Sequence, residues 1–385
     1  MKIAIAAPTE IPARRANTFQ VMKMTQALAD TGNIVRLAAP IASRGQAVSW
    51  EALARHYGLR SVFPVDWLKA EPRLRRYDYG WRAVRWARSW GADLFYTRLP
   101  QAAALASFWG MPTIFEVHDL VQGTVGPWLL RRFLQGKGAR RLVVITRALA
   151  EDLAEVLGVP LPGSSYQADL GMTLIAPDGV DLFRYHNLPD PQTARAGLQP
   201  ELPERFTVGY TGHLYTGRGA EMLLELARRL TEITFLLVGG EPTRVSSLSE
   251  QARAAGLTNV ILTGFVLNAD LPRYQAACDV LLMPYQTRVA ASSGGDISRY
   301  LSPMKLFEYM ACGRAILSSD LPVLREVLNP DNAVLLPPDD IDTWAVEITA
   351  LAADLRRRLR LGAQARRDVA AYTWEARAEK ILEGI

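Results

Sequence analysis

Short apolar runs of strand length alternate with stretches of helical period along most of this sequence. The first series of runs comprises Ile3–Ala6, Ile34–Ala38, Leu94–Tyr96, Thr113–Glu116, Leu142–Ile145 and Leu174–Ala176. The clearest helix among them is predicted over Thr18–Asp30, with Gly32 as its stop signal. Such alternation predicts a parallel sheet that is covered by helices on both faces.

A second series of the same kind follows a polar, proline-rich stretch at Asn187–Gln192, which is typical of a linker. Its predicted strands are Phe206–Tyr210, Thr234–Val238, Val260–Leu262, Val280–Met283 and Ala315–Ser318, and its predicted helices include Ala220–Leu230 and Leu271–Ala277. The sequence therefore predicts an α/β protein of two doubly wound, Rossmann-like domains, residues 1–186 and 187–372. Ligands of such sheets bind at the carboxyl ends of the strands, so the expected site is a cleft between the domains.

Composition and charge exclude several classes of protein. With 385 residues, 49% of them hydrophobic, the chain is long enough for two globular domains and too apolar for intrinsic disorder. The net charge of +5 does not require a nucleic-acid partner, because arginines are spread through nearly every segment and only six of the 44 basic residues are lysines. Cys278 and Cys312 lack metal-ligand spacing, so buried thiols are expected. No apolar run has the length of a signal peptide core or a membrane span, which predicts a cytoplasmic protein.

The segment Ser302–Gly313 is the most informative motif. Ser302 as N-cap, Pro303 at the first helical position and Gly313 past the end predict a helix of about three turns. The free amides at its start favour a phosphate, to which Lys305 would add a charge, and the carboxylate of Glu308 could accept hydrogen bonds from a ribose diol. A well-capped amphipathic helix with an incidental Lys and Glu is an equally good interpretation of the spacing alone.

Two further segments lie where strands are expected to end. Val208–Gly219 is a glycine-rich strand-to-helix turn in which backbone amides and Arg218 could hold a pyrophosphate, although a plain turn would have the same composition. His118 follows the strand that contains Glu116, and a lone histidine is more often structural than functional.

Several blocks, in order and spacing, resemble glycosyltransferase family four. They are Arg15–Asn17, Asp93–Arg98, Glu116–Asp119, Pro177–Asp181, Gly212–Leu214 with Arg218–Gly219, Thr263–Val266, Asp279–Tyr285, Ser302–Gly313 and Tyr372–Ala378. The block from Lys305 to Gly313 is the specific one, and the match covers nearly the whole chain.

The resemblance implies a GT-B fold: two Rossmann-like domains face each other across a cleft, and a C-terminal helix, 373–385, crosses back to the N-terminal domain. The N-terminal domain would bind a hydroxyl acceptor, and the C-terminal domain would bind a nucleotide-sugar linked through UDP or GDP. The implied reaction retains the anomeric configuration and needs no metal or other cofactor; the leaving diphosphate assists the proton transfer.

Residue roles follow from the same resemblance. His118, Arg218, Lys305 and Glu308 would be catalytic, with His118 beside the transferred sugar and Glu308 on the nucleotide ribose. The donor site would comprise Gly212, His213, Arg218, Gly264, Phe265, Val266, Lys305, Leu306 and Glu308. Arg14, Arg15 and Asn17 would face the donor or acceptor from the first loop.

The sequence departs from the family pattern at the first of its two paired acids. Tyr300 occupies that position, eight residues before Glu308, and Asp296 is a candidate substitute on the donor sugar. His213 stands where an Arg is common, and Arg218 where a Lys is common. A catalytically silent paralogue or a nucleotide-sugar-binding protein is therefore the alternative function.

Arginines are interleaved with tryptophans between Leu68 and Trp90, and a similar patch spans Trp128–Phe133. Basic residues beside Trp can dock a helix on an anionic membrane, which gives the hypothesis of a weak peripheral contact at the inner membrane face. The alternative, a solvated arginine face over a tryptophan-containing core, is favoured by the overall abundance of arginine.

Overall fold

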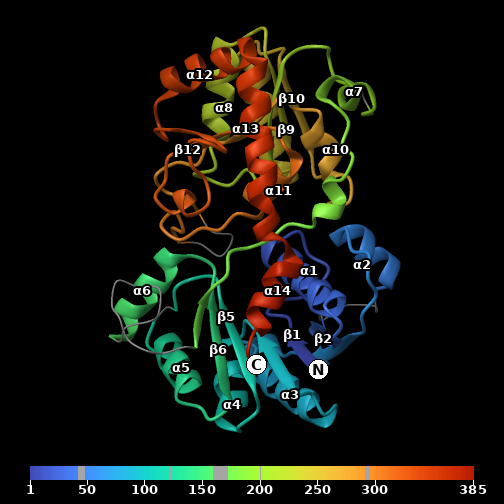
Figure 1. Cartoon of the computed structure of the whole chain (residues 1–385), viewed down its shortest axis with the longest axis vertical. Helices are drawn as coiled ribbons and strands as arrows, with labels where there is room; N and C mark the ends of the chain where they lie inside the picture. The colour runs from blue at the N-terminus through green and yellow to red at the C-terminus, as the bar shows by residue number, and fades with distance from the viewer. Residues whose placement is uncertain (42–47, 122, 159–171, 200, 291–294) are drawn as a thin grey trace. The chain divides into compact units, whose positions relative to one another are not determined.

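The computed structural model describes residues 1–41, 48–121, 123–158, 172–199, 201–290 and 295–385 (Figure 1). Contacts within the chain divide it into two compact units. Unit 1 comprises Met1–Asp178 and Trp374–Ile385, and unit 2 comprises Gly179–Thr373. Among the described residues, no helix is long and apolar enough to cross a membrane.

The division lies before the proline-rich stretch at Asn187–Gln192. Val180 forms a parallel bridge with Thr373, and the Tyr185 hydroxyl donates a hydrogen bond of 2.8 Å to Gln275. These contacts attach the segment after Asp178 to unit 2, so the predicted boundary at residue 186 differs from the one that the contacts define.

Unit 1 contains a seven-stranded parallel sheet in the order β3-β2-β1-β4-β5-β6-β7. The strands are β1 (Lys2–Ala6), β2 (Ile34–Ile41), β3 (Val65–Lys69), β4 (Leu94–Thr97), β5 (Thr113–Val117), β6 (Ala139–Val144) and β7 (Thr173–Ile175). The helices are α1 (Ala16–Asp30), α2 (Trp50–Tyr57), η1 (Pro72–Leu74), α3 (Tyr77–Ser89), α4 (Pro100–Phe108), α5 (Val125–Leu134), α6 (Arg147–Leu157) and α14 (Trp374–Leu382). The strand order reverses between β1 and β4: strands β2 and β3 are added on one side of β1, and β4 to β7 on the other. Doubly wound sheets bind ligands at this point.

Helix α1 is buried on nearly all sides, because every residue from Gln20 to Leu28 is buried. Helix α14 packs on α1 and covers the face that would otherwise meet solvent (Figure 1). The final helix of the chain is thus part of the first unit.

Unit 2 contains a six-stranded parallel sheet in the order β10-β9-β8-β11-β12-β13. The strands are β8 (Thr207–Thr211), β9 (Thr234–Val238), β10 (Val260–Gly264), β11 (Val280–Met283), β12 (Ala315–Ser319) and β13 (Val334–Leu336). The helices are η2 (Leu182–Tyr185), α7 (Pro191–Ala196), α8 (Ala220–Arg229), α9 (Pro242–Ala254), α10 (Leu271–Ala276), α11 (Met304–Cys312), η3 (Leu324–Glu326), α12 (Ile341–Ala353), α13 (Leu355–Asp368) and η4 (Val369–Tyr372). One apolar core, which includes Phe235, Leu282 and Trp344, joins this sheet to α8 and α12.

The start of α11 differs from its prediction. Pro303, not Ser302, is the N-cap, and it has no side-chain cap hydrogen bond. The helix begins only at Met304 because the backbone of Pro303, at φ −82° and ψ 122°, is extended. Gly313 ends the helix in the left-handed conformation, φ 68°, as predicted.

Candidate functional site

A buried lysine lies at the carboxyl edge of the unit 2 sheet, in the first turn of α11. Lys305 is only 8% exposed, and its Nζ lies 3.6 Å from the centroid of the Tyr210 ring and 5.5 Å from that of Tyr285. Within the described part of the chain, this ammonium has no hydrogen-bond partner. Burying a cation without a partner is costly, so its position indicates that an anion completes the site.

The glycine-rich turn after β8 surrounds this lysine with backbone. Gly212 has φ 129°, and a Cβ built on it would lie 3.0 Å from Lys305 Nζ. Gly219, at φ 82°, precedes α8, where a Cβ would lie 2.2 Å from the Pro284 carbonyl oxygen. Glycine is therefore required at both positions for the turn to approach α11 and the β11 loop closely.

Arg218 brings a second cation from the same turn. Its guanidinium carbon lies 5.7 Å from the ring centroid of Tyr215 and 5.8 Å from that of Tyr285. The buried Arg218 Nε and the Tyr285 hydroxyl both lack hydrogen-bond partners among the described residues. We call Arg218, Lys305, Tyr210 and Tyr285 the cationic cluster.

Electrostatics in the cationic cluster favour an anion. Burial, together with the neighbouring Arg218 guanidinium, lowers the pKa of Lys305 well below its usual value. Burial also raises the pKa of Tyr285, so its phenol stays protonated and can donate a hydrogen bond. The cluster can therefore offer an ammonium, a guanidinium and a phenol to one negatively charged group.

Glu308 lies one turn after Lys305 on α11 and is partly exposed. Its Oε2 accepts a hydrogen bond of 3.2 Å from Gln275 Nε2, which also donates to Thr211 Oγ1 at 3.1 Å. Tyr309 ties the helix to β8, because its hydroxyl accepts a hydrogen bond of 2.7 Å from the Thr211 amide. The carboxylate is thus held in place by its neighbours and can accept further hydrogen bonds.

The predicted base-binding segment follows β10, the edge strand of unit 2. Gly264 adopts φ 69°, and its carbonyl oxygen accepts hydrogen bonds from the Gly239 amide at 2.8 Å and the Thr263 hydroxyl at 2.9 Å. Phe265 and Val266 are partly exposed. The Leu306 side chain is buried in the core, and its amide donates to the Pro303 carbonyl at 2.9 Å; its part in the donor site stays a prediction.

The candidate sugar-binding residues have structural partners. Asp296 Oδ1 accepts hydrogen bonds of 2.9 Å from the amides of Val289 and Ser298, which lower the pKa of this carboxyl. Tyr300 is buried, at 4% exposure. His213 stacks on Tyr215 with ring centroids 4.7 Å apart, and its carbonyl accepts a hydrogen bond from Tyr210.

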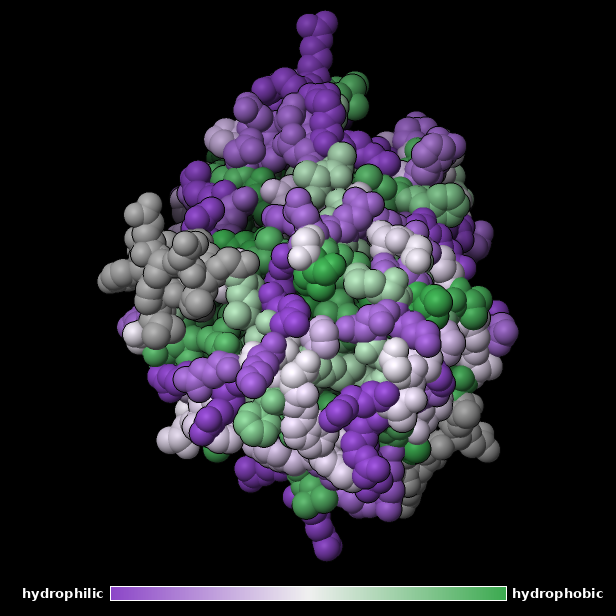
Figure 2. All heavy atoms as spheres, turned by 60° about the horizontal axis from the view of Figure 1, so that its bottom comes forward, coloured by the Kyte–Doolittle hydropathy of each residue, from purple (hydrophilic) through white to green (hydrophobic). Residues whose placement is uncertain are grey.

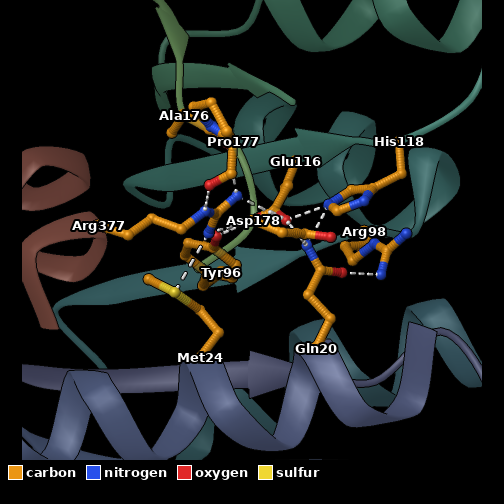
Figure 3. A network of polar contacts seen from close by, with 10 residues as sticks. All are labelled: Gln20, Met24, Tyr96, Arg98, Glu116, His118, Ala176, Pro177, Asp178 and Arg377. Atoms are coloured by element: carbon orange, nitrogen blue, oxygen red, sulfur yellow. Dashed lines mark hydrogen bonds and ion pairs between the residues drawn. The ribbon is translucent and has the colours of Figure 1, made fainter. Parts of the chain in front are cut away.

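In unit 1, His118 belongs to a buried polar network (Figure 3). Gln20, from α1, donates to Glu116 Oε1 at 2.8 Å and to Asp178 Oδ1 at 2.7 Å, and its Nε2 lies 2.5 Å from His118 Nε2. Gln20 Oε1 accepts from Arg98, and His118 Nε2 contacts Glu116 Oε1. The network therefore gathers residues that follow or end β4, β5 and β7 at the carboxyl edge of the sheet.

Charges in this network fix the state of the histidine. Burial, with Arg98 nearby, lowers the pKa of His118 to about 3, so the ring is neutral at pH 7. Burial would raise the pKa of Glu116, but Arg377 and His118 hold it at about 2. A neutral His118 that donates from Nε2 to the Glu116 carboxylate leaves Nδ1 as an acceptor for a ligand hydroxyl.

Arg377, from α14, joins this network although no role was assigned to it from the sequence. It donates to the carbonyls of Pro177 at 2.8 Å and Ala176 at 3.1 Å, and it forms an ion pair of 3.1 Å with Glu116. The only available signal was its position within the resembling Tyr372–Ala378 block. Gln20 had no signal of its own.

The first-loop candidates lie at the start of α1. Arg14 and Arg15 are exposed, and the Arg15 carbonyl accepts hydrogen bonds from the Thr18 amide at 3.0 Å and hydroxyl at 2.8 Å. Asn17 Oδ1 is buried without a hydrogen-bond partner among the described residues. Across those residues, no three His, Cys, Asp or Glu side chains converge as a metal site would require.

Two Rossmann-like units, one carrying a cationic cluster at the carboxyl edge of its sheet, define a protein of the GT-B class. Solved structures agree on the fold. Sucrose-phosphate synthase from Thermosynechococcus elongatus superposes with TM-score 0.71 at 19% identity, covering 99% of this chain and 97% of that one. Anabaena Alr3699/HepE in complex with UDP-glucose gives TM-score 0.73 at 18% identity, covering 100% and 98%.

The chain belongs to glycosyltransferase family 4. The model described as Glycosyltransferase Family 4 matches residues 19–162, and that of glycosyl transferases group 1 matches residues 205–354. A D-inositol 3-phosphate glycosyltransferase from Xylanimonas cellulosilytica is 29% identical over 63% of this chain and 55% of its own length. A 2-deoxystreptamine glucosyltransferase from Streptomyces kanamyceticus is 28% identical over 49% of this chain and 46% of its own length. The matched segments thus span about half of these relatives.

Proposed function

We propose that the protein is a retaining glycosyltransferase that moves a sugar from a UDP- or GDP-linked donor to a hydroxyl acceptor. The observation that carries this proposal is Lys305, a buried ammonium without a hydrogen-bond partner among the described residues, beside Arg218 and at the start of a helix. A diphosphate supplies the negative charge that these groups lack. The complex of HepE with UDP-glucose, in the same fold, supports a nucleotide-sugar as the ligand.

The proposed donor lies along the carboxyl edge of unit 2. Lys305, Arg218 and the amides around Gly212 bind the diphosphate, and Glu308 accepts hydrogen bonds from the ribose. The backbone at Gly264–Val266 contacts the base. Asp296 already accepts hydrogen bonds from two backbone amides. The electrostatic stabilisation of the diphosphate is therefore provided by Arg218 and Lys305 and not by a paired acid.

The proposed chemistry needs no protein nucleophile. The bond between the anomeric carbon and the diphosphate breaks, the acceptor oxygen bonds to the same face of the sugar, and its proton passes to a diphosphate oxygen. Preorganised cations stabilise the charge that develops on the leaving group. The His118 ring, whose Nε2 contacts Glu116 and Gln20, accepts a hydrogen bond from a sugar hydroxyl at Nδ1.

A metal-independent reaction and a cytoplasmic protein in peripheral contact with the inner membrane face are parts of the same proposal. Nucleotide release from a donor panel in the presence of EDTA tests the first part. The alternative function, a silent paralogue that only binds nucleotide-sugars, is favoured by Tyr300 at the position of the first acid. It predicts binding of the donor without release of the nucleotide.

Thermal unfolding with UDP, GDP, ADP and their sugars tests the donor site. A ligand at a hundred times its Kd should stabilise the protein by about 2.7 kcal/mol. Lys305→Met and Arg218→Leu should abolish this stabilisation and lower turnover by orders of magnitude. Arg253→Leu, which changes an exposed arginine of unit 2, is the matched control and should bind as the wild type does. Full stabilisation of both cluster variants would refute the assignment.

A further inference from the structure

Two helices of unit 1 each expose an apolar or aromatic residue, a tryptophan and an arginine on one face. On α3, Tyr77, Trp81 and Arg85 are four residues apart and share one exposed face. On α5, Val125, Trp128 and Arg132 are three and four residues apart and do the same. Trp81 is 43% exposed and Trp128 is 52% exposed, so these rings lie outside the core that the sequence favoured for them.

The guanidinium group of an arginine lies over the ring of each exposed tryptophan. The guanidinium carbon of Arg85 lies 4.6 Å from the Trp81 ring centroid, and that of Arg132 lies 5.4 Å from the Trp128 ring centroid. Trp109 follows the end of α4, and the guanidinium carbon of Arg88, from α3, lies 5.5 Å from its ring centroid. We call these three pairs, with Tyr77, Phe108 and Val125, the aromatic–arginine face.

The three helices form one layer, because α4 packs against both α3 and α5 (Figure 1). Helices that connect parallel strands run opposite to them, so the first turns of α3 and α5 lie toward the carboxyl edge of the sheet. That edge also carries His118 and Asp178. The aromatic–arginine face therefore begins at the edge of unit 1 that also carries the polar network.

Its charge has a single sign. Residues 73–90 contain six arginines and one acid, Asp78, and residues 124–141 contain five basic residues and no acid. The charge of Asp78 is opposed by Arg82, whose Nε lies 3.9 Å from Asp78 Oδ2. The surface therefore complements a negatively charged partner along its length.

Figure 2 turns the lower end of Figure 1 toward the viewer and shows apolar residues interspersed with hydrophilic ones there, without one broad apolar area. A stable protein interface usually has an apolar centre. Tryptophan beside arginine suits the headgroup level of a bilayer, where the ring contacts acyl chains and the cation contacts phosphates.

We propose that unit 1 docks on an anionic phospholipid bilayer through the aromatic–arginine face of α3, α4 and α5. Charge complementarity selects the bilayer over a second copy of this chain, because two such faces would repel each other. The inference rests on the peripheral membrane contact of the proposed function and deepens it, because it names the surface and the lipid charge. It does not depend on which nucleotide unit 2 binds.

Vesicle flotation of the full chain tests the proposal. Vesicles of phosphatidylglycerol and phosphatidylcholine in equal parts should carry the wild type at low salt, and vesicles of phosphatidylcholine alone should not. Each basic residue near an anionic surface contributes about fivefold to partitioning, so Arg85→Glu with Arg132→Glu should lower it at least about thirtyfold. Trp81→Ser with Trp128→Ser should lower it about tenfold.

Helix α13 supplies the matched controls on unit 2, since it also has exposed arginines and leucines. Arg356→Glu with Arg360→Glu makes the same charge change, and Leu355→Ser with Leu359→Ser removes exposed apolar groups. Both should float as the wild type does. Stabilisation by UDP, measured on every variant, reports the donor site separately, so a failure of membrane binding is distinguished from a failure of the proposed function.

Three outcomes would overturn the proposal. The first is a wild type that stays unbound to anionic vesicles at low salt. The second is loss of binding in the α13 controls equal to that in the α3 and α5 variants, which would mean attraction by net charge alone. The third is retention of full binding by the tryptophan variant together with equal binding to RNA, which would identify a general polyanion site.

Discussion

The pairing of Arg377 with Glu116 gives a stability prediction with a calculable size. Arg377→Met removes the ion pair of 3.1 Å and two hydrogen bonds to carbonyls, and it leaves Glu116 buried at 2% exposure. In the wild type, Arg377 and His118 overcome the opposing effect of burial and lower the pKa of Glu116 from about 4.5 to about 2. That shift corresponds to about 3 kcal/mol of unfolding free energy at pH 7, within the range of about 3–5 kcal/mol for breaking buried pairs.

The pH dependence separates this effect from a simple loss of packing. A depressed carboxyl pKa contributes stability above the unfolded value, near 4.5, and loses it as the pH falls toward 2. Without Arg377, burial dominates and raises the pKa of Glu116. As the pH falls below 7, Glu116 of the variant therefore binds a proton, and the free-energy cost of a buried, unpaired carboxylate disappears. The difference in unfolding free energy between wild type and variant should therefore shrink between pH 7 and pH 4.

Urea unfolding followed by tryptophan fluorescence is the suitable assay, because of the nine tryptophans only Trp344 lies in unit 2. Arg141→Met is the matched control. Arg141 also donates hydrogen bonds to backbone carbonyls at the end of α14, but its removal leaves no buried acid without a partner. Arg141→Met should lower the free energy of unfolding by about 1 kcal/mol at every pH. The reasoning fails if Arg377→Met and the double variant with Glu116→Gln are equally destabilised and the loss does not change with pH.

Three further predictions concern the site. Gly212→Ala should lower the free energy of unfolding by about 1–3 kcal/mol and weaken UDP binding, since φ is 129° and the new Cβ lies 3.0 Å from Lys305 Nζ. An unchanged melting temperature together with an unchanged thermal shift by UDP would contradict this prediction. The His118 ring, with its pKa lowered by burial to about 3, should show no titration by NMR between pH 5 and pH 8. UDP binding should be accompanied by proton uptake, because the diphosphate favours the positive charge on Lys305 that burial and Arg218 disfavour. Calorimetry in buffers of different ionisation enthalpy should detect the uptake, and Lys305→Met should remove it.

Much of the fold could be predicted because strands and helices differ in period. The predicted strands Thr234–Val238 and Val280–Met283 coincide with β9 and β11. Strand β3 was missed because Asp66 and Lys69 interrupt its apolar residues, which an edge position permits. Strand β13 was missed because it has only three residues and its pairing with β12 supplies most of the signal.

The site was predictable where its residues are close in sequence. Lys305 and Glu308 share one helix, and Arg218 belongs to a recognisable turn. Their surroundings were not predictable, because the rings of Tyr210 and Tyr285 come from separate strands and loops. The contact of Glu116 with Arg377 joins residues 261 positions apart, which no local pattern reports.

The membership of α14 in unit 1 has a consequence for synthesis. All of unit 2 emerges from the ribosome between the last strand of unit 1 and the helix that covers α1. During that interval, Glu116 lacks its arginine and one side of α1 is open to water, so the first unit must wait for the second to be translated before it is complete. Removing the last helix would therefore damage the domain that is made first, and chaperones would meet that domain in its uncovered form.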